Sequence, residues 1–280
     1  MLIKNLYAKD NEKIFIICDI INIMKSKRKV INHLKKNKKV FAVYIFLRFL
    51  VIIMMVFNFI SGNYENVYFC FLSLILFLVP SLMEMKLSIN FPDTLEIIVL
   101  LFIFASQILG EIYSFYHLIP FWDSILHTIN GFVCAGLGFS MIDVLNQSDK
   151  FHIQLTPLFV AIVGFCFSMT IGIFWEFFEY GNDVLTNSDM QKDIIVTKIN
   201  SSNLNESITD INKTLIETKD GVYIIDNGYL DIGLIDTMDD LLVNFIGAII
   251  FCTIGYFYVK KRGEGTLVKK FIIEYTPIFT

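Results

Sequence analysis

Six apolar stretches, each long enough to cross a bilayer, constrain the fold of this chain of 280 residues. A membrane-spanning helix needs about 20 mainly apolar residues, because each residue advances about 1.5 Å through a hydrocarbon core about 30 Å thick. Only 18% of the residues are charged, against about 25% in soluble domains. We therefore predict an all-α integral membrane protein, a six-span transmembrane helix bundle. The expected spans are Val40–Ile60, Val67–Met83, Leu95–Leu118, Trp122–Leu145, Leu155–Tyr180 and Met238–Val259.

Lysine and arginine are concentrated at the two ends of the chain. Residues 25–39 contain eight of them and residues 260–270 contain five, whereas the short connections at 61–66 and 114–121 contain none. Because basic residues are enriched on the cytoplasmic side of membrane proteins, both termini are expected in the cytoplasm, as an even number of spans requires. We expect a multi-pass protein of the bacterial plasma membrane, with the lipid bilayer as its partner and no nucleic acid.

This charge pattern divides the chain into five segments, with a small extracytoplasmic, β-containing insert before the last span. The segments are a basic cytoplasmic part at 1–39, spans one to five at 40–180, the insert at 181–237, span six at 238–259 and a basic cytoplasmic tail at 260–280. Within the acidic insert, residues 213–233 alternate in polarity and carry turn signals at Asp220-Gly221 and Asn227-Gly228. They predict a β-hairpin or a three-stranded meander. Such a long connection could be a lid over a polar site, or a segment that only packs against the helix ends.

Acids, a histidine and asparagines gather at one end of three spans, and the predicted topology places all three ends at the outer surface. Residues three or four apart share a helical face. The polar residues within each span have this spacing, so they share one face of their helix. Small residues at Gly131, Gly172 and Gly247 would let neighbouring helices approach closely. The candidate pocket contains Asp123, His127, Asn130, Glu176, Glu179, Asp236, Asp240 and Asn244.

Carboxylates beside an imidazole are ligands for hard or borderline divalent cations. The candidate metal ligands are His127, Glu176 and Asp240, and Mn²⁺, Mg²⁺ or Ca²⁺ would suit so many carboxylates. Alternatively, His127 could act as a general base oriented by a carboxylate. The same residue types also cap helices and bond between helices, so each one alone has a structural interpretation. The five cysteines form no CxxC pair, which gives no indication of a thiolate zinc site.

Three motifs carry a resemblance to known proteins. WDSILHTINGF, FWEFFEYGND and DTMDDLLVNFIGA resemble the YjdF-type family of uncharacterised bacterial inner-membrane proteins and, more loosely, VanZ-like proteins. The resemblance covers residues 95–259. It implies no reaction, although VanZ-like membership would imply a link to the cell envelope and to glycopeptide-antibiotic tolerance. The chain departs from the VanZ-like pattern at Glu179, where glutamine is expected, and in its long insert.

Four classes of function remain open at this point. The first is a cell-envelope protein with an outward-facing pocket for a cation, or for an anionic envelope precursor held through one. The second is a membrane-embedded, metal-dependent hydrolase or transferase acting on a lipid-linked substrate. The third is a purely structural helix bundle. A transporter ranks lower, because the sequence contains no broken helix or inverted repeat at mid-membrane.

Overall fold

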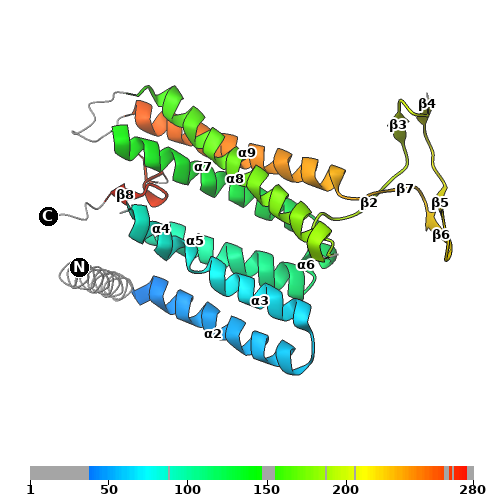
Figure 1. Ribbon diagram of the computed structural model, residues 1–280. Coiled ribbons are helices and arrows are strands. Elements are labelled where there is room, and N and C mark those ends of the chain that lie inside the picture. Colours follow the sequence, from blue (N-terminus) through cyan, green and yellow to red (C-terminus); the bar gives the residue numbers. More distant parts are fainter. Residues whose placement is uncertain are drawn as a thin grey trace, which may run out of the picture. The chain divides into compact units, whose positions relative to one another are not determined.

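A computed structural model describes residues 38–87, 89–146, 155–186, 188–204, 206–261, 265–266 and 268–275. The chain is mostly helical, and six described helices are long and apolar enough to cross a membrane (Figure 1). Helices suit this environment because they satisfy their backbone hydrogen bonds internally. The spans are Lys38–Ile60, Tyr64–Glu84, Asp93–Ile112, Trp122–Asp143, Pro157–Thr186 and Leu234–Lys260. Residues 1–37, which hold most of the basic N-terminal segment, lie outside the described residues.

The chain forms two compact units, residues 1–120 with 269–280 and residues 121–268. The helices described in the first unit are α2 (Lys38–Ile60), α3 (Tyr64–Leu76), α4 (Val79–Leu87), α5 (Asp93–Phe104), the π-helix η1 (Ala105–Ile112) and α6 (Phe115–Leu118). The short strand β1 (Ile89–Asn90) pairs antiparallel with β8 (Glu274–Tyr275). The core of this unit is an apolar cluster that includes Leu47, Phe77 and Leu100.

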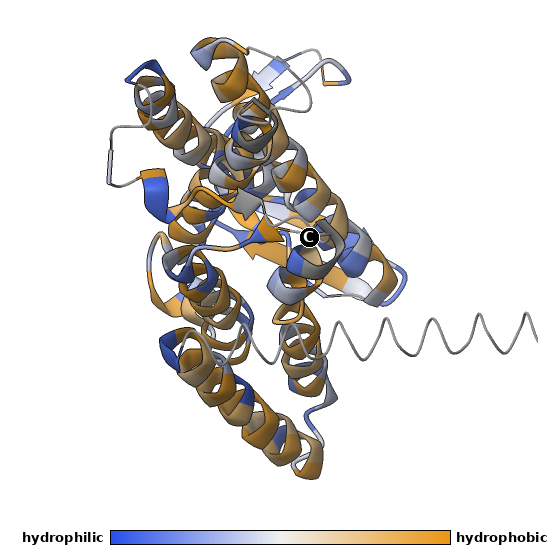
Figure 2. Ribbon diagram, turned by 90° about the vertical axis from the view of Figure 1, so that its left-hand side faces the viewer, coloured by the Kyte–Doolittle hydropathy of each residue, from blue (hydrophilic) through white to orange (hydrophobic). Residues whose placement is uncertain are grey.

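Many large apolar side chains remain exposed on the helices, as expected for surfaces that contact lipid. Phe57 on α2 is 70% exposed and Phe177 on the fifth span is 64% exposed. Figure 2 shows that hydrophobic residues make up most of each long helix. In water such a surface would mark an interaction site or an aggregation hazard. In a bilayer the same surface contacts the lipid chains.

The third span differs from the expected single helix over Leu95–Leu118. After Phe104 the chain widens into η1, and it then turns at Ser114, whose φ is 58°. Gly110 lies against Tyr116, because a Cβ on this glycine would come within 2.3 Å of the tyrosine ring. Ser106 Oγ also lies 3.2 Å from the Tyr116 hydroxyl. The returning α6 therefore needs the space that the wider helix and the glycine leave.

Three helices form the body of the second unit: α7 (Trp122–Asn146), α8 (Pro157–Thr186) and α9 (Leu234–Lys260) (Figure 1). Two glycines bring α7 and α9 into backbone contact. A Cβ on Gly131 would lie 2.0 Å from the Asn244 carbonyl oxygen, and one on Gly247 would lie 2.0 Å from the Thr128 carbonyl oxygen. From α8, Ser168 Oγ donates to the Gly131 carbonyl oxygen at 2.8 Å. Small residues thus hold the three helices close together.

The connection between α8 and α9 contains only two-stranded pairings among its described residues. Its strands are β2 (Ile194–Val196), β3 (Ile199–Ser201), β4 (Glu206–Ile208), β5 (Lys213–Thr218), β6 (Gly221–Asp226) and β7 (Tyr229–Asp231). Strands β5 and β6 form the expected hairpin, but the meander is wrong, because β7 pairs with β2 instead of β6. The chain turns sharply at Asn227, whose φ is 64°, and this turn directs β7 away from the hairpin.

Two aspartates fasten this connection to the helix ends. Asp183 on α8 accepts hydrogen bonds from Ser188 Oγ and from the backbone N–H groups of Met190 and Gln191, at 2.7, 2.7 and 2.8 Å. Asp236 on α9 accepts one from the backbone N–H of Lys192 at 2.8 Å. Charge-assisted hydrogen bonds such as these are stronger than neutral ones. The base of the insert is therefore held firmly to the ends of α8 and α9.

Candidate metal centre

The three helices of the second unit bring four carboxylates and one imidazole together. His127 Nε2 lies 3.4 Å from Asp123 Oδ1 and 3.5 Å from Asp240 Oδ2, and Nδ1 lies 3.8 Å from Glu176 Oε1. Glu179 shares a set of candidate metal donors with Glu176 and Asp240. We call Asp123, His127, Glu176, Glu179 and Asp240 the acid cluster.

Helical spacing explains how each helix contributes to the acid cluster. Asp123 and His127 are four residues apart on α7, and Glu176 and Glu179 are three apart on α8, so each pair shares a face. Asp240 comes from the first two turns of α9. The close α7–α9 approach at Gly247 lies two turns further along the same helix. The cluster is thus formed by helix ends that the glycine contacts already align.

The acid cluster is buried, and part of it has no hydrogen-bond partner. His127, Glu176, Glu179 and Asp240 are 7%, 5%, 7% and 4% exposed. Among the described residues, Oδ2 of Asp240 accepts no hydrogen bond, and Thr237 is the side chain placed to donate to Glu176. Trp175 Nε1 donates to Glu179 Oε1 at 2.7 Å. Burying an unsatisfied carboxylate costs free energy, so Asp240 needs either a proton or a cation.

The donor atoms fall into two sets that share one residue. One set is Asp123, His127 and Asp240, and the other is Glu176, Glu179 and Asp240. Within each set, one donor atom from every residue lies within 4.8 Å of the others. Ligand atoms bonded to one ion at about 2.0–2.6 Å lie at most about 4–5 Å from one another. Each set therefore has the dimensions of a cation site.

The other expected pocket residues lie beside the acid cluster rather than in it. Asn130 Nδ2 donates to Asn244 Oδ1 at 3.0 Å, and Asn244 Nδ2 lies 3.6 Å from Met169 Sδ. This amide pair joins α7 to α9 one turn deeper in the bundle. Asp236 bonds to the Lys192 backbone and belongs to neither donor set. Its role is to hold the insert.

Trp175 is a contributor that the sequence analysis did not identify. An aromatic residue in a span is usually a packing residue, yet its indole N–H donates to Glu179. The signal was the spacing of four residues between Trp175 and Glu179, which places them on one helical face. Two further polar residues four apart within a span, Gln107 and Glu111, belong to η1 in the first unit.

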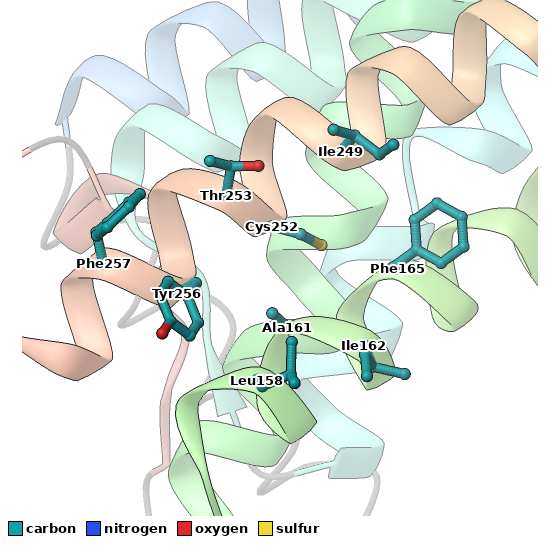
Figure 3. A pocket seen from close by; sticks show the side chains of 9 residues that line it. All are labelled: Leu158, Ala161, Ile162, Phe165, Ile249, Cys252, Thr253, Tyr256 and Phe257. Carbon is teal, nitrogen blue, oxygen red and sulfur yellow. The ribbon is translucent and has the colours of Figure 1, made fainter.

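A second hollow in this unit has a different character. A groove of about 480 Å³ lies between the beginning of α8 and the end of α9, and Figure 3 shows the side chains that line it, among them Phe165, Ile249 and Phe257. Its lining contains no carboxylate and no imidazole. It lies toward the helix ends opposite to those that carry the acid cluster. The groove therefore offers none of the carboxylate and imidazole ligands found in the acid cluster.

Comparison with known proteins places the chain among membrane proteins without an assigned reaction. The sequence model of a family described as "Predicted membrane protein (DUF2238)" matches residues 43–261, which include most of the first span, the other five spans and the acid cluster. An uncharacterised protein of Thermotoga maritima is 24% identical over 102 residues, which cover 36% of this chain and 50% of that protein. The chain thus matches only half the length of this relative. No solved structure matches the chain.

Proposed function

Since the chain belongs to the DUF2238 family of predicted membrane proteins, we propose that it is a multi-pass cell-envelope protein that binds divalent cations in its acid cluster. The observation that carries this proposal is the burial of Glu176 and Asp240 beside the imidazole of His127, with Oδ2 of Asp240 lacking a hydrogen-bond partner among the described residues. Intramembrane acids are costly and usually serve a function or pair with another group. A bound cation would supply that pairing.

The scarcity of basic side chains on the three helices that carry the acid cluster supports a cation over an internal ion pair. Helices α7 and α8 contain no lysine or arginine, and the only one in α9 is Lys260 at its last position. Lys260 is 20 residues beyond Asp240, or about 30 Å at 1.5 Å per residue. His127 alone cannot neutralise four carboxylates. The first choice of ion is Mn²⁺, which accepts both imidazole and carboxylate ligands.

Metal analysis of the purified protein tests this proposal. Full-length protein in detergent is expected to retain Mn²⁺ after free metal is removed, and His127→Ala should lower its affinity at least about tenfold, since even the supporting residues of metal sites have effects of that size. The matched control is His117→Ala, because His117 is an exposed histidine in the first unit. Wild-type protein that retains no divalent ion would refute the proposal.

We also propose a bacterial cytoplasmic membrane with both termini inside and the insert outside. The support is the density of Lys and Arg near both chain ends and their absence from residues 61–66 and 114–121. A cysteine introduced at the exposed Glu217, on β5, should react in intact cells with a membrane-impermeant maleimide. A cysteine introduced at Lys261 should react only after lysis. The reverse pattern would place the acid cluster at the cytoplasmic surface.

A metal-dependent hydrolase or transferase acting on a lipid-linked substrate is the second candidate. The observation that favours it is that each donor set provides only three protein ligands, which leaves coordination positions for water or substrate. The Asp123 side chain is 26% exposed, so the cluster has a route to its surroundings. The YjdF-type and VanZ-like resemblances remain part of this proposal, as does an anionic envelope precursor as the ligand.

A further inference from the structure

We infer that the acid cluster holds two divalent cations, with Asp240 as the carboxylate shared between them. This inference rests on the proposed cation binding and adds the number of ions and the role of each residue. The first support is geometric, because Asp240 is the only residue common to the two donor sets. A carboxylate has two oxygens and can bind one ion with each of them.

The orientation of the imidazole assigns the first ion. His127 Nε2 faces both Asp123 Oδ1, at 3.4 Å, and Asp240 Oδ2, at 3.5 Å. These three atoms can converge on one cation. A histidine that binds metal through one nitrogen usually donates its other N–H to a carboxylate. Here Nδ1 lies 3.8 Å from Glu176 Oε1, which is longer than a hydrogen bond, so Glu176 would have to move closer to orient the imidazole.

The second ion would lie among oxygens only. Glu176, Glu179 and Asp240 provide three carboxylates whose donor atoms lie within 4.8 Å of one another. Glu176 is 5% exposed and has Thr237 placed to donate to it, whereas Asp240 is 4% exposed and its Oδ2 accepts no hydrogen bond from the described residues. This unpartnered oxygen points to a ligand that the hydrogen bonds of the described residues do not supply. The indole of Trp175 holds Glu179 in place.

Charge balance favours two ions over one. The acid cluster contains four carboxylates and one imidazole, and α7 and α8 contribute no lysine or arginine. Two divalent cations neutralise four carboxylates. A single divalent cation would leave two negative charges buried among spanning helices, where uncompensated charge is costly. Protons on the acids are the competing way to remove that charge.

Counting bound ions tests the inference. Detergent-purified, full-length protein is stripped of metal, equilibrated with Mn²⁺, freed of unbound ions and analysed for manganese per chain. We expect two. One ion per chain would overturn the shared-ligand arrangement and leave cation binding intact, whereas none would overturn both. Two Mn²⁺ ions about 3.5–4 Å apart, as in two-metal sites, should also show the broadened electron paramagnetic resonance spectrum of a coupled pair.

Single substitutions separate the roles of the residues. His127→Ala should leave one ion, in the carboxylate set, and Glu179→Gln should leave one ion, in the histidine set. Asp240→Asn should weaken both and leave fewer than one. Asp239→Asn, at the exposed neighbour of Asp240, is the matched control and should keep two. Variants that elute like wild type on gel filtration count as folded. Loss of both ions in folded Glu179→Gln, or two ions in Asp240→Asn, would overturn the assignment.

Discussion

Alanine at Gly131 or Gly247 is expected to destabilise the second unit more than any other small substitution. The added Cβ would come within 2.0 Å of a backbone carbonyl oxygen on the facing helix in both cases, at Asn244 for Gly131 and at Thr128 for Gly247. Backbone atoms cannot rotate away as a side chain can, so α7 and α9 would have to separate. Overpacking of this kind costs about 1–3 kcal/mol and occasionally more. Thermal unfolding in detergent measures the change.

Gly181→Ala is the matched control for these two substitutions. Gly181 lies within α8, and a Cβ there would have no atom within 4 Å. Alanine favours the helix over glycine by up to about 1 kcal/mol, so this variant should unfold at the wild-type temperature or above it. Equal unfolding temperatures for Gly247→Ala and Gly181→Ala would show that the close approach of α7 and α9 is incorrect.

Asp240→Asn is expected to change stability in opposite directions with and without metal. In metal-free protein it removes one of several neighbouring buried carboxylates, so the variant should be more stable than wild type. In Mn²⁺ the wild type should gain stability by binding, about 2.7 kcal/mol when free metal is 100 times the dissociation constant. The variant, which lacks the shared ligand, should gain less. The unfolding temperatures of both proteins in chelator and in Mn²⁺ give the four values needed.

Asp239→Asn tests whether this reversal is specific to the acid cluster. Asp239 adjoins Asp240 in sequence but is exposed, so its variant should follow wild type in both conditions. If chelator and Mn²⁺ give wild type the same unfolding temperature, the acids are neutralised by protons, and the structural interpretation of the cluster would stand.

The six spans could be predicted because length and hydrophobicity alone decide whether a helix can cross a bilayer. The sequence also allowed us to predict that four side chains come together, namely Asp123, His127, Glu176 and Asp240. Their spacing on each helix and the direction of each span place the polar faces at one end of the bundle. Asp236 carries the same spacing signal as Asp240, yet it binds the backbone of Lys192. Spacing locates a face on a helix but does not identify the partner.

Features that depend on contacts between separate elements could not be predicted from the sequence. The π-helix η1 ends where the turn at Ser114 brings Tyr116 back against Gly110, and the β2–β7 pairing joins residues more than thirty positions apart. Neither leaves a local pattern in the sequence. Likewise, Gly131 and Gly247 were expected to permit close approach, but which carbonyl each one faces is decided by the crossing of α7 and α9.

The separate pairing of β5 with β6 has a practical consequence for imaging a chain of only 32.4 kDa. The hairpin turn at Lys219–Asp220 is exposed, and the firm attachment of the insert lies elsewhere, at Asp183 and Asp236. Exposed loop tips tolerate insertions. An epitope grafted at this turn would let an antibody fragment bind and add mass to the particle for electron cryo-microscopy, while the helix ends that carry the acid cluster stay unaltered.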